Sequence, residues 1–323
     1  MRLRVWIATL MLTICATAAM AQEQPWPSKA IRWIVPYPPG GGTDIAARIV
    51  AAEISRSLGQ TVVVENRPGG NTIIGTGAVA QAAPDGYTLG LITDAFSANI
   101  ALERKMPYDS EKDFVPVVQL LQVPFALIVN PELVPMRTLP EVVRHAKANP
   151  RWLTLASLGP GSPHETAASW FKSMAGIDML IVPYRGGNAA LQDLLAGHVK
   201  SMLYGVSAAE ETIKAGRVRA IAVTSAARVN AAPNIPTFAE QGFPDYQFAS
   251  TFGVVVPRGT PPEIVRRLNA EINKALETPA VRTRIAATGG EIMGGPPERL
   301  AQVIHADVAK YRKIYAIPGA RPN

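Results

Sequence analysis

The glycines at 40–42, followed by Thr43 and Asp44, form the stretch of this sequence best suited to binding chemistry. An apolar run at 31–35 precedes them and a helical pattern begins at Ile45, so the expected order is strand, turn and helix. Glycine tolerates positive φ and lets bare N–H groups approach a bound group. A helix N-terminus adds unpaired donors and partial positive charge. The stretch therefore suits an anion, although an ordinary turn is an equally good interpretation.

Known nucleotide motifs do not fit these glycines. No lysine follows them, as the phosphate-binding loop requires, and their spacing is not the dinucleotide G-x-G-x-x-G. Asp44 would repel an anion, which argues against phosphate. We expect Asp44 to cap its own helix, to hold bridging waters, or to accept a hydrogen bond from a ligand hydroxyl or ammonium group.

Ser162 and His164 are the residues of this chain most like a nucleophile and its base. Such a pair must meet in space together with an orienting acid. Residues two apart at a helix start do not face one another, and no G-x-S-x-G sequence surrounds the serine. We therefore interpret Ser162 as a helix cap before Pro163 and keep a secreted hydrolase as the weakest alternative.

The composition argues against several other classes of site. Cys15 is the only cysteine, and the four histidines are well separated, so we predict no metal and no cofactor. The formal charge is +7, but the lysines and arginines are scattered, and we predict no nucleic-acid partner. The positive charge would help to attract anionic solutes.

The first residues are typical of an export signal. Residues 1–21 combine a basic start, an apolar core at 5–15 and an A-x-A cleavage site at 19–21. The core is shorter than the roughly 20 residues of a membrane span. Ile14 precedes Cys15, and because it is not small we expect no lipid anchor. We predict a periplasmic protein, exported through a cleaved signal peptide.

Strand and helix patterns alternate along the remaining chain and predict an α/β fold. Strands are expected at 31–35, 61–65, 87–92, 125–129, 153–156, 179–182, 200–203, 218–224, 248–256 and 291–293. Helices are expected at 44–58, 72–82, 138–147, 163–175, 188–196, 261–276, 279–288 and 296–314, with another ending at 215. Loops would follow the carboxyl ends of strands at 37–44, 66–71, 93–99, 157–164 and 184–187. Ligands of open α/β sheets bind outside such strand ends.

A set of short motifs carries a family resemblance. In order, they are Val35-Pro36-Tyr37-Pro38-Pro39-Gly40-Gly41-Gly42-Thr43-Asp44, Val64-Glu65-Asn66-Arg67-Pro68-Gly69-Gly70, Pro84-Asp85-Gly86-Tyr87-Thr88-Leu89, Pro107-Tyr108-Asp109 and Val182-Pro183-Tyr184-Arg185-Gly186. Over about residues 26–310 the sequence resembles the Bug family, the periplasmic receptors of tripartite tricarboxylate transporters.

The resemblance implies a two-lobed, type II-like periplasmic-binding-protein (Venus-flytrap) fold, in which helices flank a mixed sheet in each lobe. We predict residues 22–123 and 227–323 in the first lobe and 124–226 in the second. One small organic acid would bind between the lobes of a monomer and pass to a membrane permease with a large and a small subunit. A ligand-loaded sensor for a signalling membrane protein is the alternative that uses the same cleft.

The resemblance also assigns ligand-binding residues. The two loops that embrace a carboxylate map to Tyr37, Gly41, Gly42 and Asp44, and to Ser157, Gly159, Gly161, Ser162 and His164. Further lining is expected from Thr93, Ser97, Arg185 and Gly186, with Arg185 as the one obvious cation. Asp94 and Phe96 depart from the small polar run expected there, which would suit a ligand with an amine or a ring.

Overall fold

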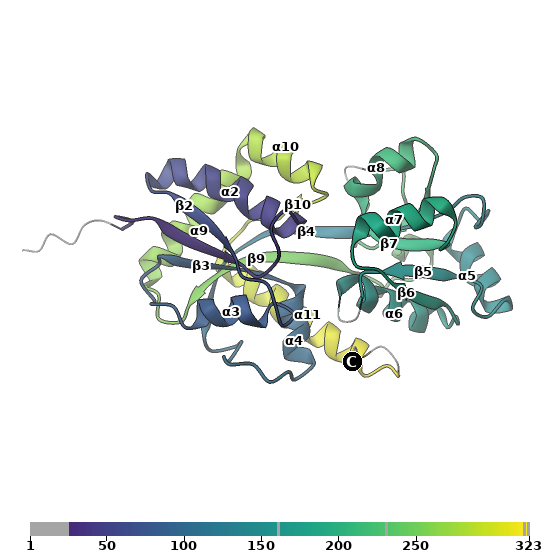
Figure 1. Ribbon diagram of the computed structural model, residues 1–323, viewed down its shortest axis with the longest axis horizontal. Helices are drawn as coiled ribbons and strands as arrows, with labels where there is room; N and C mark the ends of the chain where they lie inside the picture. Colours follow the sequence, from purple (N-terminus) through teal and green to yellow (C-terminus); the bar gives the residue numbers. More distant parts are fainter. Residues whose placement is uncertain (1–25, 160–161, 230–231, 319–320, 322–323) are drawn as a thin grey trace, which may run out of the picture.

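The computed structural model describes residues 26–159, 162–229, 232–318 and 321 of the 323-residue chain. The predicted signal peptide and Gly161 lie outside these residues. Within the described ranges, no helix has both the length and the apolar character that crossing a bilayer requires. Two α/β lobes lie side by side (Figure 1), as the predicted fold class requires.

In the sheet of the first lobe, two strands run antiparallel to all the others. The strands are β1 (Ile31–Val35), β2 (Val62–Asn66), β3 (Thr88–Thr93), β9 (Ala249–Pro257), the first part of β4 (Phe114–Val129) and β10 (Glu291–Ile292). The helices are α2 (Gly42–Leu58), α3 (Ile73–Ala80), α4 (Asp94–Ala101), α9 (Pro262–Glu277), α10 (Pro279–Ala287) and α11 (Pro297–Tyr315). α2, α9 and α10 cover one face of the sheet, and α3, α4 and α11 cover the other.

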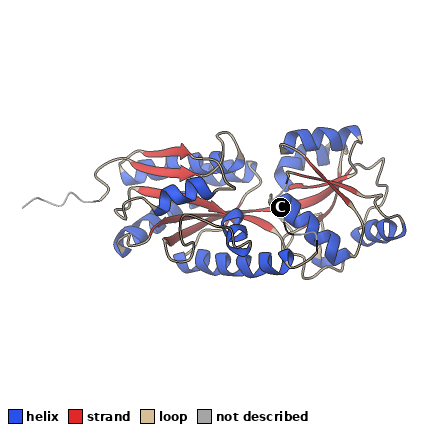
Figure 2. Ribbon diagram, turned by 60° about the horizontal axis from the view of Figure 1, so that its bottom comes forward, coloured by secondary structure: helices blue, strands red, loops and turns tan. Residues whose placement is uncertain are grey.

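The second lobe repeats this plan on a smaller sheet (Figure 2). Its strands are the last part of β4, β5 (Thr154–Ser157), β6 (Leu180–Pro183), β7 (Ser201–Gly205) and β8 (Arg219–Val223). Its helices are α5 (Leu139–Ala148), α6 (Pro163–Ala175), α7 (Gly187–Ala196) and α8 (Val206–Lys214).

Strand directions turn the loops of the two lobes toward each other. β4 runs from the first lobe into the second, and β9 returns antiparallel to it. β3 is antiparallel to β9, and β1 is parallel to β3, so both run toward the second lobe. β7 is antiparallel to β4, and β5 is parallel to β7, so both run toward the first lobe. The carboxyl ends of the parallel strands therefore face one another across the gap.

Two expectations about these elements were wrong. The strand expected at 125–129 begins at Phe114 and is 16 residues long. Proline removes a ladder donor and usually argues against a central strand, but Pro116 and Pro124 are accommodated here, with register shifts of β4 against β9 at 116–118 and 119–121. The segment 93–99, expected as a loop, is mostly α4, because the Thr93 side chain caps that helix by accepting from the Ala95 N–H at 3.2 Å.

The residue boundaries of the lobes stay a prediction, and contacts favour shifting one of them. The bridge between Thr237 and Val223 attaches the chain after β8 to that strand. Gln241 adds a 2.7 Å hydrogen bond to the Ile221 carbonyl, and Phe238 is buried in the core of the second lobe. We propose that this lobe extends to about Phe248, where the chain crosses back.

Thr224 joins the three segments that connect the lobes. Its hydroxyl accepts from the Phe125 N–H at 2.9 Å and donates to the Phe248 carbonyl at 2.5 Å. Its backbone N–H donates to the Phe125 carbonyl at 2.8 Å, and its carbonyl accepts from the Phe248 N–H at 2.9 Å. The side chain is fully buried, so water cannot replace these partners.

Replacing this hydroxyl should weaken the connection between the lobes. Thr224→Val keeps the shape but leaves buried backbone groups unpaired, so the free energy of unfolding should fall by about 1–3 kcal/mol. Thr224→Ser keeps the hydroxyl and should recover most of the loss. Urea denaturation of the three proteins measures the difference, and equal stability of the Val and Ser variants would contradict it.

Candidate functional site

Asp44 holds the first glycine loop through its own carboxylate. It is 3 % exposed and lies in the first turn of α2. The carboxylate accepts from the Gly40 N–H at 2.9 Å, from Arg48 Nε at 3.0 Å and from Asn66 Nδ2 at 2.9 Å. The Arg48 hydrogen bond is the main cause that lowers the pKa of Asp44 to about 2. Asp44 therefore anchors the loop, with its negative charge neutralised by Arg48. This explains how a carboxylate can lie next to a turn that suits an anion.

Gly41 and Gly42 leave backbone donors open at the start of α2. Both are exposed, and a Cβ on Gly42 would meet nothing within 4 Å. The first helical hydrogen bond runs from the Ile45 N–H to the Gly41 carbonyl at 2.9 Å. The N–H groups that precede Ile45 in the helix consequently have no helical acceptor, as at any helix N-terminus.

Tyr37 and Thr93 meet at the carboxyl ends of β1 and β3. Their hydroxyl oxygens are 2.6 Å apart, and either one can donate. Burial and the nearby Asp94 raise the pKa of Tyr37, so its hydroxyl stays protonated at neutral pH. Ser97 follows on α4 and is 2 % exposed. The structure thus brings Tyr37 and Thr93 together, as polar groups on the first lobe.

Asp94 and Phe96 point into the protein rather than toward a ligand. The expectation that they suit a ligand with an amine or a ring was therefore wrong. Asp94 accepts from the Ser250 hydroxyl at 2.5 Å and from the Tyr311 hydroxyl at 2.9 Å. Burial raises the pKa of Asp94 to about 6. Phe96 is 3 % exposed and lies edge-on to Phe114 at 5.5 Å between ring centres. Both residues serve the packing of α4.

The second lobe presents a glycine and serine turn after β5. Ser157 is fully buried, and its hydroxyl accepts from the Gly159 N–H at 3.3 Å. Gly159 has φ of +90°, a left-handed conformation that favours glycine. Ser162 caps α6 by accepting from the Glu165 N–H at 3.2 Å, as the sequence predicted.

His164 is a neutral, stacked ring. It lies 4.5 Å from the ring centre of Phe125 at an angle of 27°. Burial lowers the pKa of His164 to about 4. Its Nδ1 is buried and has no hydrogen-bond partner among the described residues. No hydrogen bond in the described structure joins this ring to Ser162 or to a carboxylate, so the two residues do not form a catalytic pair here.

Arg185 and Gly186 lie at the start of α7. Arg185 is exposed, and no ion pair or hydrogen bond of its side chain is found within the described part of the chain. Gly186 precedes the helix and accepts from the Ala190 N–H at 3.2 Å. A Cβ on the following Gly187 would come within 2.9 Å of the Tyr204 ring, so the loop passes close to β7.

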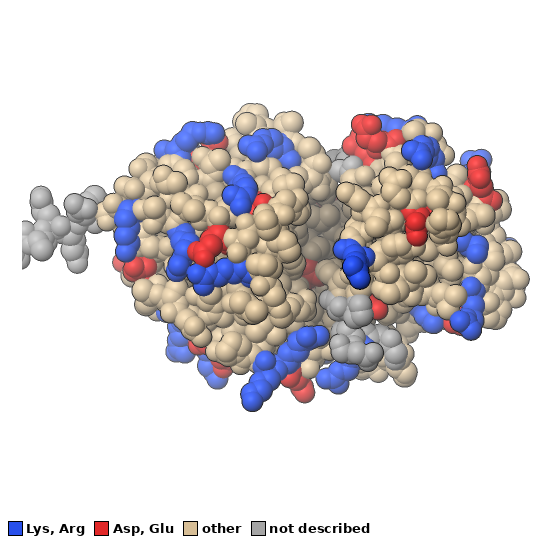
Figure 3. Space-filling model, viewed as in Figure 1, with Lys and Arg blue, Asp and Glu red and all other residues tan. Residues whose placement is uncertain are grey.

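The predicted residues form two groups, one on each lobe. No hydrogen bond or ion pair links the groups where the chain is described, and a groove separates the lobes in the space-filling view (Figure 3). Arg48 and Asn66 complete the first group and were missed by sequence reasoning. Asn66 opens the second glycine-rich loop, which was a signal, but its 22-residue separation from Asp44 gives no periodic pattern.

The family comparison agrees with this architecture. The profile described as "Tripartite tricarboxylate transporter family receptor" matches residues 46–318. A protein from the tcbD-tcbE intergenic region of Pseudomonas sp. strain P51 is 39% identical over 95% of this chain and 92% of its own length. Protein BugT of Bordetella pertussis is 34% identical over 97% of this chain and 96% of its own.

Solved structures resemble the whole fold. Rpa4515 of R. palustris with adipate shares 34% identity and a TM-score of 0.78, covering 90% of this chain and 97% of that one. MatC of Rhodopseudomonas palustris with bound malate shares 31% identity and a TM-score of 0.75, covering 90% and 99%. The Bug resemblance read from the motifs is confirmed, and the chain belongs to the tripartite tricarboxylate transporter receptor family.

Proposed function

We propose that this protein is a periplasmic receptor that captures a small carboxylate between its two lobes and delivers it to a two-subunit membrane permease. The observation that carries the proposal is the pair of loop groups at facing strand ends, each with a helix N-terminus. α2 offers the open N–H groups after Gly41, and α7 begins beside the exposed Arg185. Lobe closure would bring both groups onto one anion.

The chemistry of the groups supports a carboxylate over a phosphate. The donors are backbone N–H groups, hydroxyls and one arginine, while Asp44 already holds Arg48 and leaves little net positive charge in its loop. Relatives with bound malate and adipate support a ligand of this size and class. We assign ligand contacts to Tyr37, Gly41, Gly42, Thr93 and Ser97, and across the groove to Ser157, Gly159, Ser162, His164, Arg185 and Gly186.

Calorimetry with adipate and malate tests the proposal, and native mass spectrometry of freshly purified protein identifies any retained ligand. A free ligand concentration of 100 times Kd should raise the free energy of unfolding by roughly 2.7 kcal/mol. Absence of binding for both acids and for a wider panel of small carboxylates would overturn the proposal. Unchanged ligand after long incubation would separate this receptor from the hydrolase alternative.

Arg185 should contribute one charged hydrogen bond to the ligand. Arg185→Gln should weaken adipate binding at least tenfold, since a charge-assisted bond is worth roughly 1.5–3 kcal/mol. Arg217→Gln, which removes an exposed charge elsewhere on the second lobe, is the matched control and should change little. If both variants bind equally well, helix N-termini alone anchor the carboxylate.

A sensor role would use the same groove and differ only in its membrane partner. Crosslinking of the ligand-loaded protein in native membranes distinguishes the two roles. Recovery of a permease subunit supports transport, whereas recovery of a signalling kinase supports sensing.

A further inference from the structure

Two large apolar side chains are exposed beside the ligand loops of the first lobe. Ile74 is 59 % exposed in the first turn of α3, and Ile45 is 40 % exposed directly after Asp44 in α2. Single exposed apolar residues are ordinary on protein surfaces, so their place in the fold decides whether they matter. Here both lie near the start of a helix that follows a parallel strand, on the side of the first lobe that faces the second.

The turn between β2 and α3 holds Ile74 in place. The Asn71 side chain donates to Asn99 Oδ1 at 3.0 Å, and Asn99, which is fully buried on α4, donates back to the Asn71 carbonyl at 2.8 Å. The Ile74 side chain lies back over this turn, since a Cβ added to Gly69 would be 2.6 Å from its Cδ1. Side chains of a helix lean toward its N-terminus, which is the end of α3 nearest to the second lobe. The exposed surface of Ile74 is therefore fixed beside the groove.

The strand order places this turn opposite one loop of the second lobe. From the shared strand β4, the first lobe continues through β9, β3, β1 and β2, and the second lobe through β7, β5 and β6. β2 and β6 are the outermost strands, so the loops at their carboxyl ends lie farthest from the connecting strands. A rotation about those strands moves the outer loops most, and it would bring the loops after β2 and β6 together.

Tyr184 gives the loop after β6 an apolar surface. Its hydroxyl donates to the Asp193 carboxylate on α7 at 2.8 Å, which fixes the ring within the second lobe. The ring packs against the hydrophobic core of that lobe and stays partly exposed. Leu158, in the loop after β5, is also partly exposed and packs against the same core. The strand order thus sets Tyr184 opposite Ile74. In the same way, it sets Leu158 opposite Ile45.

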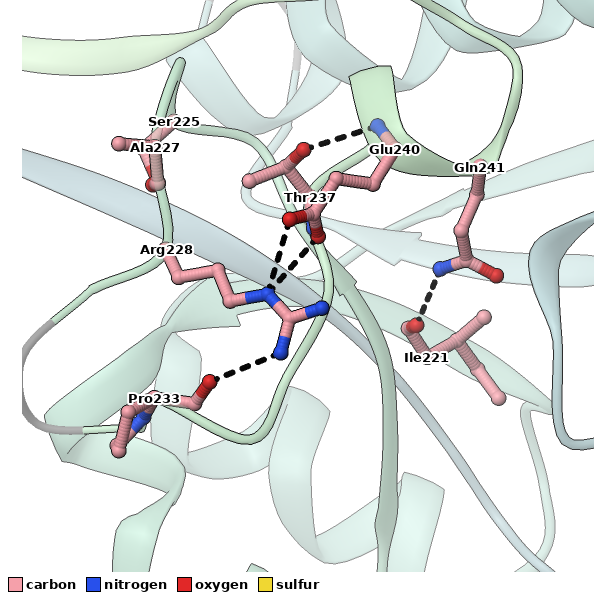
Figure 4. Close-up of polar contacts among 8 residues, drawn as sticks. All are labelled: Ile221, Ser225, Ala227, Arg228, Pro233, Thr237, Glu240 and Gln241. Atoms are coloured by element: carbon pink, nitrogen blue, oxygen red, sulfur yellow. Dashed lines mark hydrogen bonds and ion pairs between the residues drawn. The ribbon is translucent and has the colours of Figure 1, made fainter.

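The second lobe can approach as one body, because the chain that leaves β8 is fastened to it (Figure 4). Arg228 Nε donates to both carboxylate oxygens of Glu240 at 3.0 and 2.9 Å, and Arg228 Nη1 donates to the Pro233 carbonyl at 3.1 Å. Gln241 joins this segment to β8 through the Ile221 carbonyl at 2.7 Å. All of these bonds lie within the second lobe, so closure does not have to break them.

We propose that Ile74 and Tyr184 form an apolar contact between the lobes in the closed, ligand-bound state, with Ile45 and Leu158 as a second contact nearer the connecting strands. This inference rests on the proposed receptor function, because the carboxylate ligand stabilises the closed state. The contact slows release of the ligand, since the lobes must separate before it leaves. It does not affect entry, because the two surfaces are still apart when the ligand arrives.

Cysteine crosslinking tests where the contact lies. Cys15 is the only cysteine of the sequence and lies in the predicted signal peptide, so the exported double variant Ile74→Cys, Tyr184→Cys carries only the two introduced thiols. The probe is adipate or malate, whichever binds more tightly. It should accelerate disulfide formation at least tenfold, read on non-reducing gels. The matched control pairs Tyr184→Cys with Val63→Cys, which is 50 % exposed within β2, and should show no acceleration.

Truncation of one side chain tests what the contact does. Ile74→Ser should weaken binding of the same probe about fivefold, since more than half of this side chain loses its burial in the closed state. Stopped-flow measurements should show a faster release rate and an unchanged association rate. Val63→Ser shortens a similarly exposed side chain and should bind the probe as the wild type does. Thermal unfolding of both variants checks that each is folded.

Failure of the contact differs from failure of the receptor function. If the probe binds the wild type but both cysteine pairs crosslink at equal rates, or Ile74→Ser releases it at the wild-type rate, the contact is overturned and the receptor function stands. If no carboxylate of the panel binds, the receptor function fails. In that case the ligand-free proteins decide: the contact is also overturned if Ile74→Cys, Tyr184→Cys crosslinks no faster than the control pair, and it is supported if crosslinking is faster.

Discussion

Replacing Asp44 with asparagine should lower the free energy of unfolding at pH 7 by roughly 2 kcal/mol and weaken carboxylate binding at least tenfold. The carboxylate ties the Gly40 N–H, Arg48 and Asn66 to one point, and asparagine cannot neutralise Arg48. The released loop would lose the geometry that aims the N–H groups of α2. Glu53→Gln, on the same helix, removes a partly exposed carboxylate and is the matched control.

The pH dependence of this effect has a definite sign. The pKa of Asp44 is lowered from 3.8 to about 2 in the folded protein. Its contribution is therefore complete above pH 4 and disappears as the pH falls toward 2. Urea denaturation should show the full difference between wild type and Asp44→Asn at pH 7, and about half of it at pH 3. A difference that does not shrink with acid would mean that Asp44 acts through packing and not through charge.

Local patterns in the sequence were enough to place most elements and both glycine turns. The capping of α6 by Ser162 follows from residue types within a few positions, and α2 was expected from Asp44, two residues after its start at Gly42. The partners of Asp94 could not be found in this way, because Ser250 and Tyr311 are 156 and 217 residues away in the chain. The direction of a side chain depends on such distant contacts. They therefore decide whether the side chain binds a ligand or packs inside the protein.

The length of β4 illustrates the same limit within one element. Prolines are unusual in a central strand, yet the irregular pairing of β4 with β9 accommodates two of them. The consequence is functional, since only a strand that extends from Phe114 to Val129 belongs to both lobes and connects them. A sequence pattern describes one strand at a time and does not include the partner that pairs with it.

Replacing Asp94 with asparagine should raise the free energy of unfolding above pH 6. The side chain is 2 % exposed, and burial is the main cause that raises its pKa from 3.8 to about 6. Asp307 raises this pKa further, while Lys310 and the Ser250 and Tyr311 hydroxyls oppose the rise. A carboxyl with a raised pKa stabilises the fold while protonated, and this contribution is lost as the pH rises from about 4 through 6. Asparagine carries no charge and avoids that loss.

Urea denaturation of wild type and Asp94→Asn at pH 4.5 and pH 8 measures the effect. The wild type should lose about 2 kcal/mol between these values relative to the variant. Asparagine has only one side-chain oxygen that can accept a hydrogen bond. The variant therefore loses or reverses the bond to either Ser250 or Tyr311, and this loss reduces its gain in stability. Asp245→Asn removes an exposed carboxylate and should keep the wild-type slope. Parallel curves for wild type and Asp94→Asn would show that Asp94 stays ionised in the fold, held by its two hydroxyl donors.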